Sequence, residues 1–155
     1  MKKIINEIGG GFKEPVKALQ IGGPLGGIVP IEEVKKLNFD FQEFIEAGFM
    51  LGHGSIVSIP KDFSMIKYIH HLFEFSAEES CGKCFPGRLG SYRGKEMFDQ
   101  AINEAKKIPL KLLNELLITM KEGCLCALCG AIPVPIVNIL KYFSDEIKND
   151  IVQEN

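Results

Sequence analysis

The chain has 155 residues, of which 46% are hydrophobic and 25% are charged, and its formal net charge at pH 7 is -2. These values are typical of one globular domain or two very small ones, and they argue against a disordered chain. The weak negative charge gives no reason to expect nucleic acid as a partner. No apolar stretch is long enough for a signal peptide or a membrane span, so we expect a cytoplasmic protein without membrane insertion.

The first 60 residues are rich in glycine and predict a small α+β unit. Ile4–Ile8 has the pattern of a short helix that a glycine triplet ends, and residues 41–47 favour another helical turn. Val16–Ile21 alternates as a strand, and Leu51–Ile59 predicts a second strand that two glycines interrupt. The glycine-rich loop between them lacks the Lys-Ser/Thr of a phosphate-binding loop, so we interpret it as a turn.

The rest of the chain is helical by its hydrophobic period. Apolar side chains recur at i, i+3, i+4 and i+7 in four segments, which predicts four amphipathic helices joined by short connections, as in a four-helix bundle. The four stripes are Ile66–Phe73, Phe98–Ala105, Leu113–Met120 and Ile136–Ile147. We therefore expect an α+β protein with two domains, 1–62 and 63–155.

Two cysteine pairs carry the chemistry of the sequence. Cys81 and Cys84 form one CxxC, Cys126 and Cys129 form a second, and Cys124 lies two residues before the second pair. CxxC spacing aims two sulfurs at one centre, and four such sulfurs suit a structural zinc or an iron–sulfur cluster. The pairs fall on the first and third connections of the predicted bundle. These connections can meet at the same end of an up-down bundle, so we expect the thiols to converge.

The thiols and their neighbours also have simpler interpretations. A free cysteine is commonly a small buried apolar side chain, and this interpretation weighs most for Cys124. Without a secretion signal, however, paired cysteines favour metal ligands over disulfides. Lys83 and Arg88 are either solvated charges or groups that raise the reduction potential of a nearby cluster.

Several segments, in chain order, resemble one known family. They are Ala18–Gly27 (ALQIGGPLGG), Glu79–Pro86 (ESCGKCFP), Leu125–Leu128 (LCAL) and Pro133–Ile147 (PVPIVNILKYFSDEI). The sequence resembles the C-terminal part of the flavin-bearing, NADH-oxidising subunit of respiratory complex I and of related NAD-linked hydrogenases and formate dehydrogenases. The resemblance implies a truncated, soluble-ligand-binding β-grasp unit followed by a four-helix domain that holds a [4Fe–4S] cluster.

The sequence departs from this family in two ways. The family's flavin and NADH domain has no counterpart here, so the resemblance implies that this chain binds no FMN or NAD and is not catalytic alone. The family's cluster motif is Cys-x-x-Cys-x-x-Cys, and its third position is Gly87. Cys126 matches the family's fourth ligand, whereas Cys129 stands where the family usually has glycine. The resemblance therefore implies a relocated ligand, with cluster or metal ligands that are Cys81, Cys84, Cys126 and Cys129, and Cys124 as the alternative to Cys129.

Three hypotheses for the function follow. The first is an electron-transfer iron–sulfur module, a subunit or fragment of an NAD(P)H-linked oxidoreductase. The second is a zinc-bound or metal-free docking module derived from such a subunit, and the third is a piece of a broken or artificial gene. The expected partners are a flavoprotein or another iron–sulfur subunit. An exposed strand edge would also allow self-association into a homo-oligomer.

Overall fold

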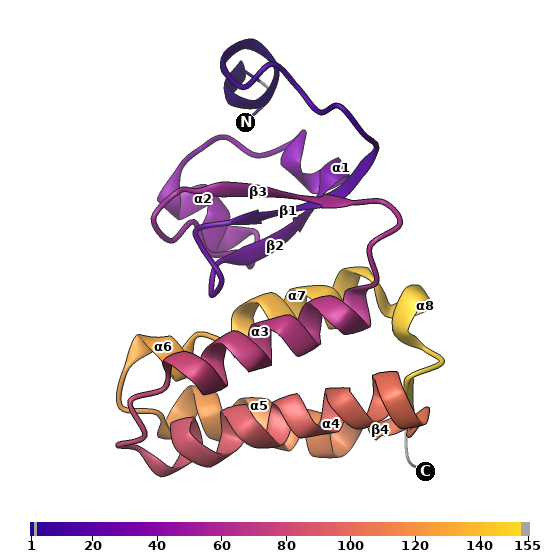
Figure 1. The fold of residues 1–155 in the computed structure, drawn as a ribbon. Helices are drawn as coiled ribbons and strands as arrows, with labels where there is room; N and C mark the ends of the chain where they lie inside the picture. Colours follow the sequence, from indigo (N-terminus) through magenta and orange to yellow (C-terminus); the bar gives the residue numbers. More distant parts are fainter. Residues whose placement is uncertain (2, 153–155) are drawn as a thin grey trace. The chain divides into compact units, whose positions relative to one another are not determined.

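The structure is a computed structural model that describes residue 1 and residues 3–152. It is broadly α+β, as the sequence predicts, and the chain divides into two compact units, Met1–Phe63 and Ser64–Asn155 (Figure 1). Among the described residues, every helix is too short or too polar to cross a membrane.

The first unit is built on a three-stranded antiparallel sheet. The predicted strand β1 (Val16–Ile21) lies in the middle, between β2 (Gly27–Pro30) and β3 (Ile56–Pro60). In register, Leu19 of β1 faces Val29 of β2 and Ser58 of β3. Three short helices complete the described part of this unit: η1 (Ile4–Ile8), α1 (Ile31–Val34) and α2 (Phe41–Glu46).

The predicted strand Leu51–Ile59 forms only in its second half, where β3 begins at Ile56. The preceding residues turn instead, and Gly52 has a φ of 51°. A Cβ at Gly52 would lie 2.3 Å from the carbonyl oxygen of Gly22, which follows β1. The two glycines therefore let the loop after β1 and the loop before β3 approach more closely than side chains would permit.

The second unit contains the four predicted helices and the short elements that connect them. The long helices are α3 (Met65–Glu79), α4 (Ser91–Glu104), α5 (Leu110–Gly123) and α7 (Pro133–Tyr142). The connecting elements are η2 (Pro86–Gly90), β4 (Ile108–Pro109), α6 (Ala127–Gly130), α8 (Ser144–Ile147) and β5 (Ile151–Val152). β4 and β5 pair in parallel, so they tie the start of α5 to the chain after α8.

Two of the predicted apolar stripes run past the ends of the helices. Ala105 lies outside α4, where it caps the helix in the left-handed conformation at φ 53°. The stripe Ile136–Ile147 is interrupted at Phe143, whose φ of -123° and ψ of 25° separate α7 from α8. The hydrophobic period reports which side chains face the core, and it continues where the backbone has already left the helical angles.

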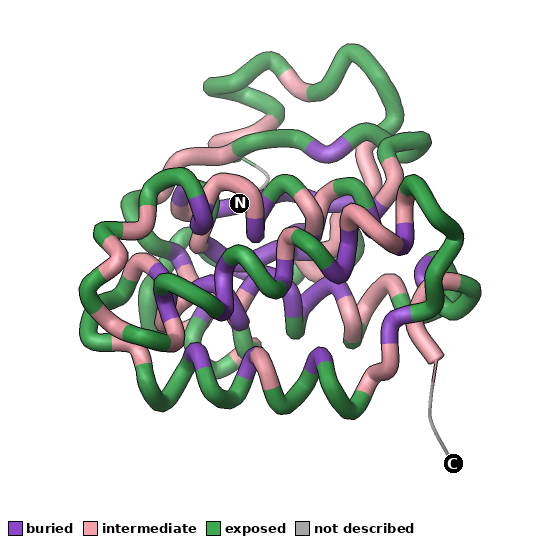
Figure 2. Tube along the Cα trace, turned by 60° about the horizontal axis from the view of Figure 1, so that its bottom comes forward, coloured by how far each residue is buried: buried purple, intermediate pink, exposed green. Residues whose placement is uncertain are grey.

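Buried residues recur along one side of each long helix, with exposed residues between them (Figure 2). In the core, the rings of Phe73 on α3 and Phe98 on α4 stack with their centroids 5.8 Å apart. Gly94 makes this close approach of α3 and α4 possible, because a Cβ there would lie 2.2 Å from the Phe73 ring. An ion pair between Lys95 and Glu74, 2.9 Å apart, joins the same two helices outside the core.

We expect Gly94→Ala to destabilise the second unit by about 1–3 kcal/mol, the usual cost of overpacking a core. The small gain in helix propensity from replacing glycine does not offset a 2.2 Å overlap with an aromatic ring. Urea unfolding followed by circular dichroism measures the change. Gly130→Ala is the matched control, because its Cβ would make an ordinary 3.6 Å contact with the Cys124 side chain. Equal stability of the two variants would contradict the packing argument.

Candidate metal centre

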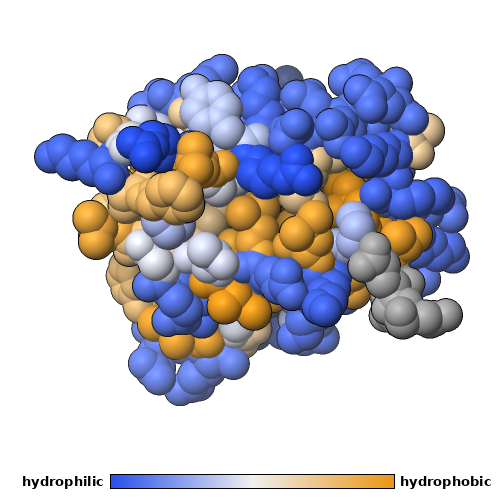
Figure 3. Space-filling view, turned by 90° about the horizontal axis from the view of Figure 1, so that it is seen from below, coloured by the Kyte–Doolittle hydropathy of each residue, from blue (hydrophilic) through white to orange (hydrophobic). Residues whose placement is uncertain are grey.

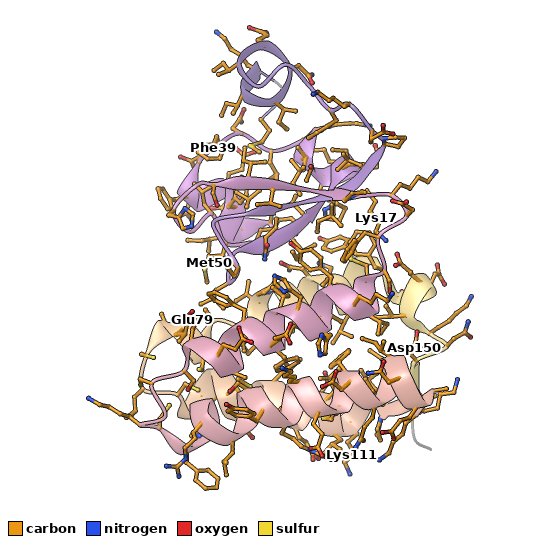
Figure 4. The ribbon with its side chains drawn as sticks, viewed as in Figure 1. Lys17, Phe39, Met50, Glu79, Lys111 and Asp150 are labelled. Atoms are coloured by element: carbon orange, nitrogen blue, oxygen red, sulfur yellow. The ribbon has the colours of Figure 1, made fainter. Side chains whose placement is uncertain are left out.

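The two cysteine-bearing connections lie at the same end of the helical unit (Figure 1). One leads from α3 to η2, and the other leads from α5 through α6 towards α7; α6 contacts both η2 and α5. Glu79, the last residue of α3, marks this end in Figure 4. The cysteines on these connections are Cys81, Cys84, Cys124, Cys126 and Cys129.

The sulfurs of Cys84 and Cys129, one from each connection, both lie close to Gly87. A Cβ built on Gly87 would lie 2.8 Å from the sulfur of Cys84 and 3.2 Å from the sulfur of Cys129. Both contacts are tighter than ordinary van der Waals packing. The Cys129 sulfur therefore occupies the space into which a side chain at position 87 would project, which is where the family motif places its third cysteine.

Cys129 is the most enclosed of the five thiols, with an exposed fraction of 2%. Its sulfur lies 3.6 Å from the hydroxyl oxygen of Ser76 on α3 and 3.9 Å from the carbonyl oxygen of Gly87. Cys81 and Cys126, in contrast, are exposed. Among the described residues, no three cysteine, histidine or acidic side chains stand close enough to hold a single metal ion.

Cys84 and Cys124 differ strongly in acidity. The backbone N–H groups of Leu125 and then of Gly87 donate to the Cys84 sulfur and lower its pKa below the usual value of a thiol. Burial, together with the charge of Cys84, raises the pKa of Cys124 to about 12, and the Cys124 thiol donates a hydrogen bond to Cys84. Cys84 therefore ionises more readily than an ordinary thiol, and Cys124 beside it ionises much less readily.

We expect iodoacetamide to modify Cys84 well before Cys124 in the metal-free, reduced chain at neutral pH. Only the thiolate reacts, and its fraction is raised at Cys84 and very small at Cys124. Peptide mass spectrometry over a time course gives both rates. Raising the pH towards 12 should continue to accelerate the labelling of Cys124 after the Cys84 rate has levelled off, because Cys84 ionises at lower pH. Faster labelling of Cys124 at neutral pH would contradict the hydrogen-bond arrangement.

Sequence reasoning named all five thiols but missed two residues that shape their surroundings. The sequence showed Gly87 only as the site of a lost ligand. In the structure, the absence of a side chain at Gly87 leaves room for the Cys129 sulfur. Ser76 was overlooked, although its position was a signal. It lies three residues after Phe73 on the apolar face of α3, where a buried polar side chain needs a hydrogen-bond partner.

Comparison with known proteins identifies the family. The family model for the NADH-ubiquinone oxidoreductase-F iron-sulfur binding region matches residues 67–150, more than half of the chain. The chain belongs to this family. The match covers α3 through α8 and both cysteine-bearing connections. The helical unit is thus an iron–sulfur binding domain of the type found in NADH-linked oxidoreductase subunits, as the sequence resemblance implies.

Relatives of this oxidoreductase-F iron–sulfur region extend the similarity through the first unit. The chain is 30% identical over 149 residues to the NADP-reducing hydrogenase subunit HndC of Solidesulfovibrio fructosivorans, covering 94% of this chain and 30% of that protein. It is 31% identical over 155 residues to an NADH-quinone oxidoreductase subunit of Rickettsia bellii (strain OSU 85-389), covering 97% of this chain and 37% of that protein. The chain therefore spans about a third of the length of these relatives.

The fold is shared with a solved structure. An NAD+-reducing [NiFe]-hydrogenase in the H2-reduced state contains a chain that superposes with a TM-score of 0.76 at 20% sequence identity. The superposition covers 92% of this chain and 24% of that one. At this identity the likeness establishes the common fold.

Proposed function

We propose that this chain is an electron-transfer module of an NADH-linked oxidoreductase, and that Cys81, Cys84, Cys126 and Cys129 hold its [4Fe–4S] cluster. Such a cluster supplies one-electron transfer chemistry when it is bound. The observation that carries the ligand set is that the sulfurs of Cys84 and Cys129 both lie beside Gly87. It supports a compensated ligand change, in which a thiol from α6 replaces the thiol absent from position 87.

The residues at the cysteine end fit a cluster held by thiolates. Backbone N–H groups of Leu125 and Gly87 already stabilise negative charge on Cys84, as they would on a ligand thiolate. The sulfur of Cys124, the alternative ligand, is not among the three atoms nearest the Cβ position of Gly87, whereas the Cys84 and Cys129 sulfurs are. A soft, all-thiolate donor set suits iron–sulfur chemistry and also zinc, and family membership favours iron.

The surface near the thiols supports an approach by a partner protein. Leu125, between two cysteines, is 82% exposed, and Phe85, next to Cys84, is 66% exposed. Phe85 also borders an apolar cavity of about 220 Å³ that Leu89 and Leu116 help to line. Apolar side chains gather among charged ones on the face of the helical unit shown in Figure 3. Exposed apolar groups of this kind mark protein interaction sites.

We infer that the partner is a flavoprotein segment or another iron–sulfur subunit, which gives electrons to or takes them from this chain. The relatives are named as subunits of an NADP-reducing hydrogenase or of an NADH-quinone oxidoreductase, and they are about three times as long as this chain. The nicotinamide and flavin chemistry would then reside outside these 155 residues. Electron transfer in the cytoplasm, within a complex of different chains rather than a homo-oligomer, is the arrangement we propose.

Anaerobic purification from the native source, followed by metal and sulfide analysis, tests this function. We expect iron and acid-labile sulfide in equal amounts, a brown colour, and an electron paramagnetic resonance signal after reduction with dithionite. Zinc without acid-labile sulfide would overturn the proposal and favour a structural module. Reduction of the 155-residue chain by NADH should require an added flavoprotein, and its reduction by NADH alone would overturn the assignment of the nicotinamide site to residues outside this chain.

A further inference from the structure

Ser76 is a fully buried polar residue near the end of α3, with an exposed fraction of 0%. It follows Ile69 and Phe73 on the face of α3 that packs into the core. A hydroxyl in such a place lowers stability unless it has a hydrogen-bond partner, so its partner indicates its role. That partner is the Cys129 sulfur, on an element 53 residues further along the chain.

Other hydroxyls in the same helical unit behave differently. Ser91 donates to the carbonyl oxygen of Gly87 at 2.6 Å, and Thr119 donates to that of Glu115 at 2.7 Å. Each of these reaches back four residues, the usual solution for serine and threonine inside a helix. Ser76 instead donates across the core to Cys129, at a sulfur–oxygen distance of 3.6 Å. A local backbone bond therefore does not account for Ser76.

We propose that Ser76 is a positioning residue for the cluster, and that its hydroxyl donates a hydrogen bond to the Cys129 thiolate and raises the reduction potential. This inference rests on the proposed function and on Cys129 as a ligand. Hydrogen bonds to the ligand sulfurs of an iron–sulfur cluster are one of the main influences on its potential. A donor stabilises negative charge on sulfur, and the reduced state carries more of that charge, so the donor favours reduction.

The Cys129 thiolate needs such a donor more than the other ligands do. It is 2% exposed, so water contributes little to its stabilisation. The Gly87 carbonyl oxygen, 3.9 Å away, accepts a hydrogen bond from the protonated thiol and repels the thiolate. The Ser76 hydroxyl is the side-chain donor that the structure places at the Cys129 sulfur.

Redox titration of the cluster, monitored by electron paramagnetic resonance, tests this inference in the full chain. We expect Ser76→Ala to keep its iron and sulfide while its midpoint potential becomes more negative, by about 59 mV for a tenfold change in the one-electron equilibrium. Ser76→Thr keeps the hydroxyl, so its midpoint potential should stay close to that of the wild type. Ser76→Val introduces a side chain of the same shape as threonine without the hydroxyl, so its potential should be as negative as that of Ser76→Ala. Thr119→Val is the matched control, which removes a helical hydroxyl that bonds only locally, and it should leave the potential unchanged.

The possible results separate this inference from the proposed function. A wild-type chain without iron would overturn both. If the wild-type chain holds a cluster and neither Ser76→Ala nor Ser76→Val changes its midpoint potential, the role of Ser76 is overturned and the proposed function stays intact. If both hydroxyl-free variants lose iron while Ser76→Thr keeps it, with equal helix content by circular dichroism, the hydroxyl holds the ligand sulfur, which supports the inference.

Discussion

Cys129→Ala should yield a folded chain that has lost its cluster, with iron and acid-labile sulfide reduced at least tenfold relative to the wild type. The Cys129 sulfur lies beside position 87, which has no side chain, so its removal takes away the thiol that we propose replaces the family's third cysteine. Removing a ligand also removes binding free energy that stabilises the folded state. Metal analysis, the visible absorption spectrum and a thermal melt of the anaerobically purified variant measure these losses.

The matched control is Cys124→Ala, which removes a neighbouring half-buried thiol by the same truncation. We expect this variant to keep its iron, because the Cys124 sulfur, unlike that of Cys129, is not among the three atoms nearest the Cβ position of Gly87. Cys124 instead serves as a hydrogen-bond donor to Cys84. Its potential should fall slightly, since a donor to a ligand sulfur is lost. The opposite pattern, with iron lost from Cys124→Ala and kept in Cys129→Ala, would make Cys124 the ligand.

The fold was predictable from the sequence where long hydrophobic periods exist. The stripes from Ile66, Phe98, Leu113 and Ile136 each correspond to a helix, and Val16–Ile21 is a strand with the predicted bounds. Short elements escaped prediction, because β2 and α1 have only four residues each, too few to display a period. The break at Phe143 escaped for another reason, since its side chain continues the apolar stripe while its backbone does not.

The candidate site was predictable in composition and less so in geometry. CxxC spacing and the order of the helices suffice to place both cysteine-bearing connections at one end of the unit. The different environments of the thiols depend on burial and on backbone N–H groups from the other connection, such as Leu125 for Cys84. These long-range contacts leave no local pattern. The four proposed ligands therefore stay a prediction until metal analysis is done.

Exchanging the residues at positions 87 and 129 provides the sharpest test of the relocated ligand. Gly87→Cys alone should destabilise the chain and hinder cluster assembly, because its Cβ would lie 2.8 Å from the Cys84 sulfur, 3.2 Å from the Cys129 sulfur and 3.3 Å from the Cys129 Cβ. Cys129→Gly alone should lose the cluster, because a ligand is missing. The double variant removes the two crowding atoms of residue 129 and returns a thiol to position 87. Only the Cys84 sulfur, at the end of a side chain, then has to shift, so we expect the double variant to regain most of the iron.

The reason for this rescue is that the two positions share one space. Mutations at neighbouring sites are not additive, and the coupling between them is measured by comparing the double variant with the two single variants. Glycine is required at position 129 for the test, since alanine would keep the Cβ that crowds residue 87.

Iron content and the midpoint potential are the readouts. The potential of the double variant should be lower than that of the wild type, because Ser76 loses its sulfur partner. A double variant as poor in iron as Cys129→Gly would show that Cys129 does not replace a ligand at position 87.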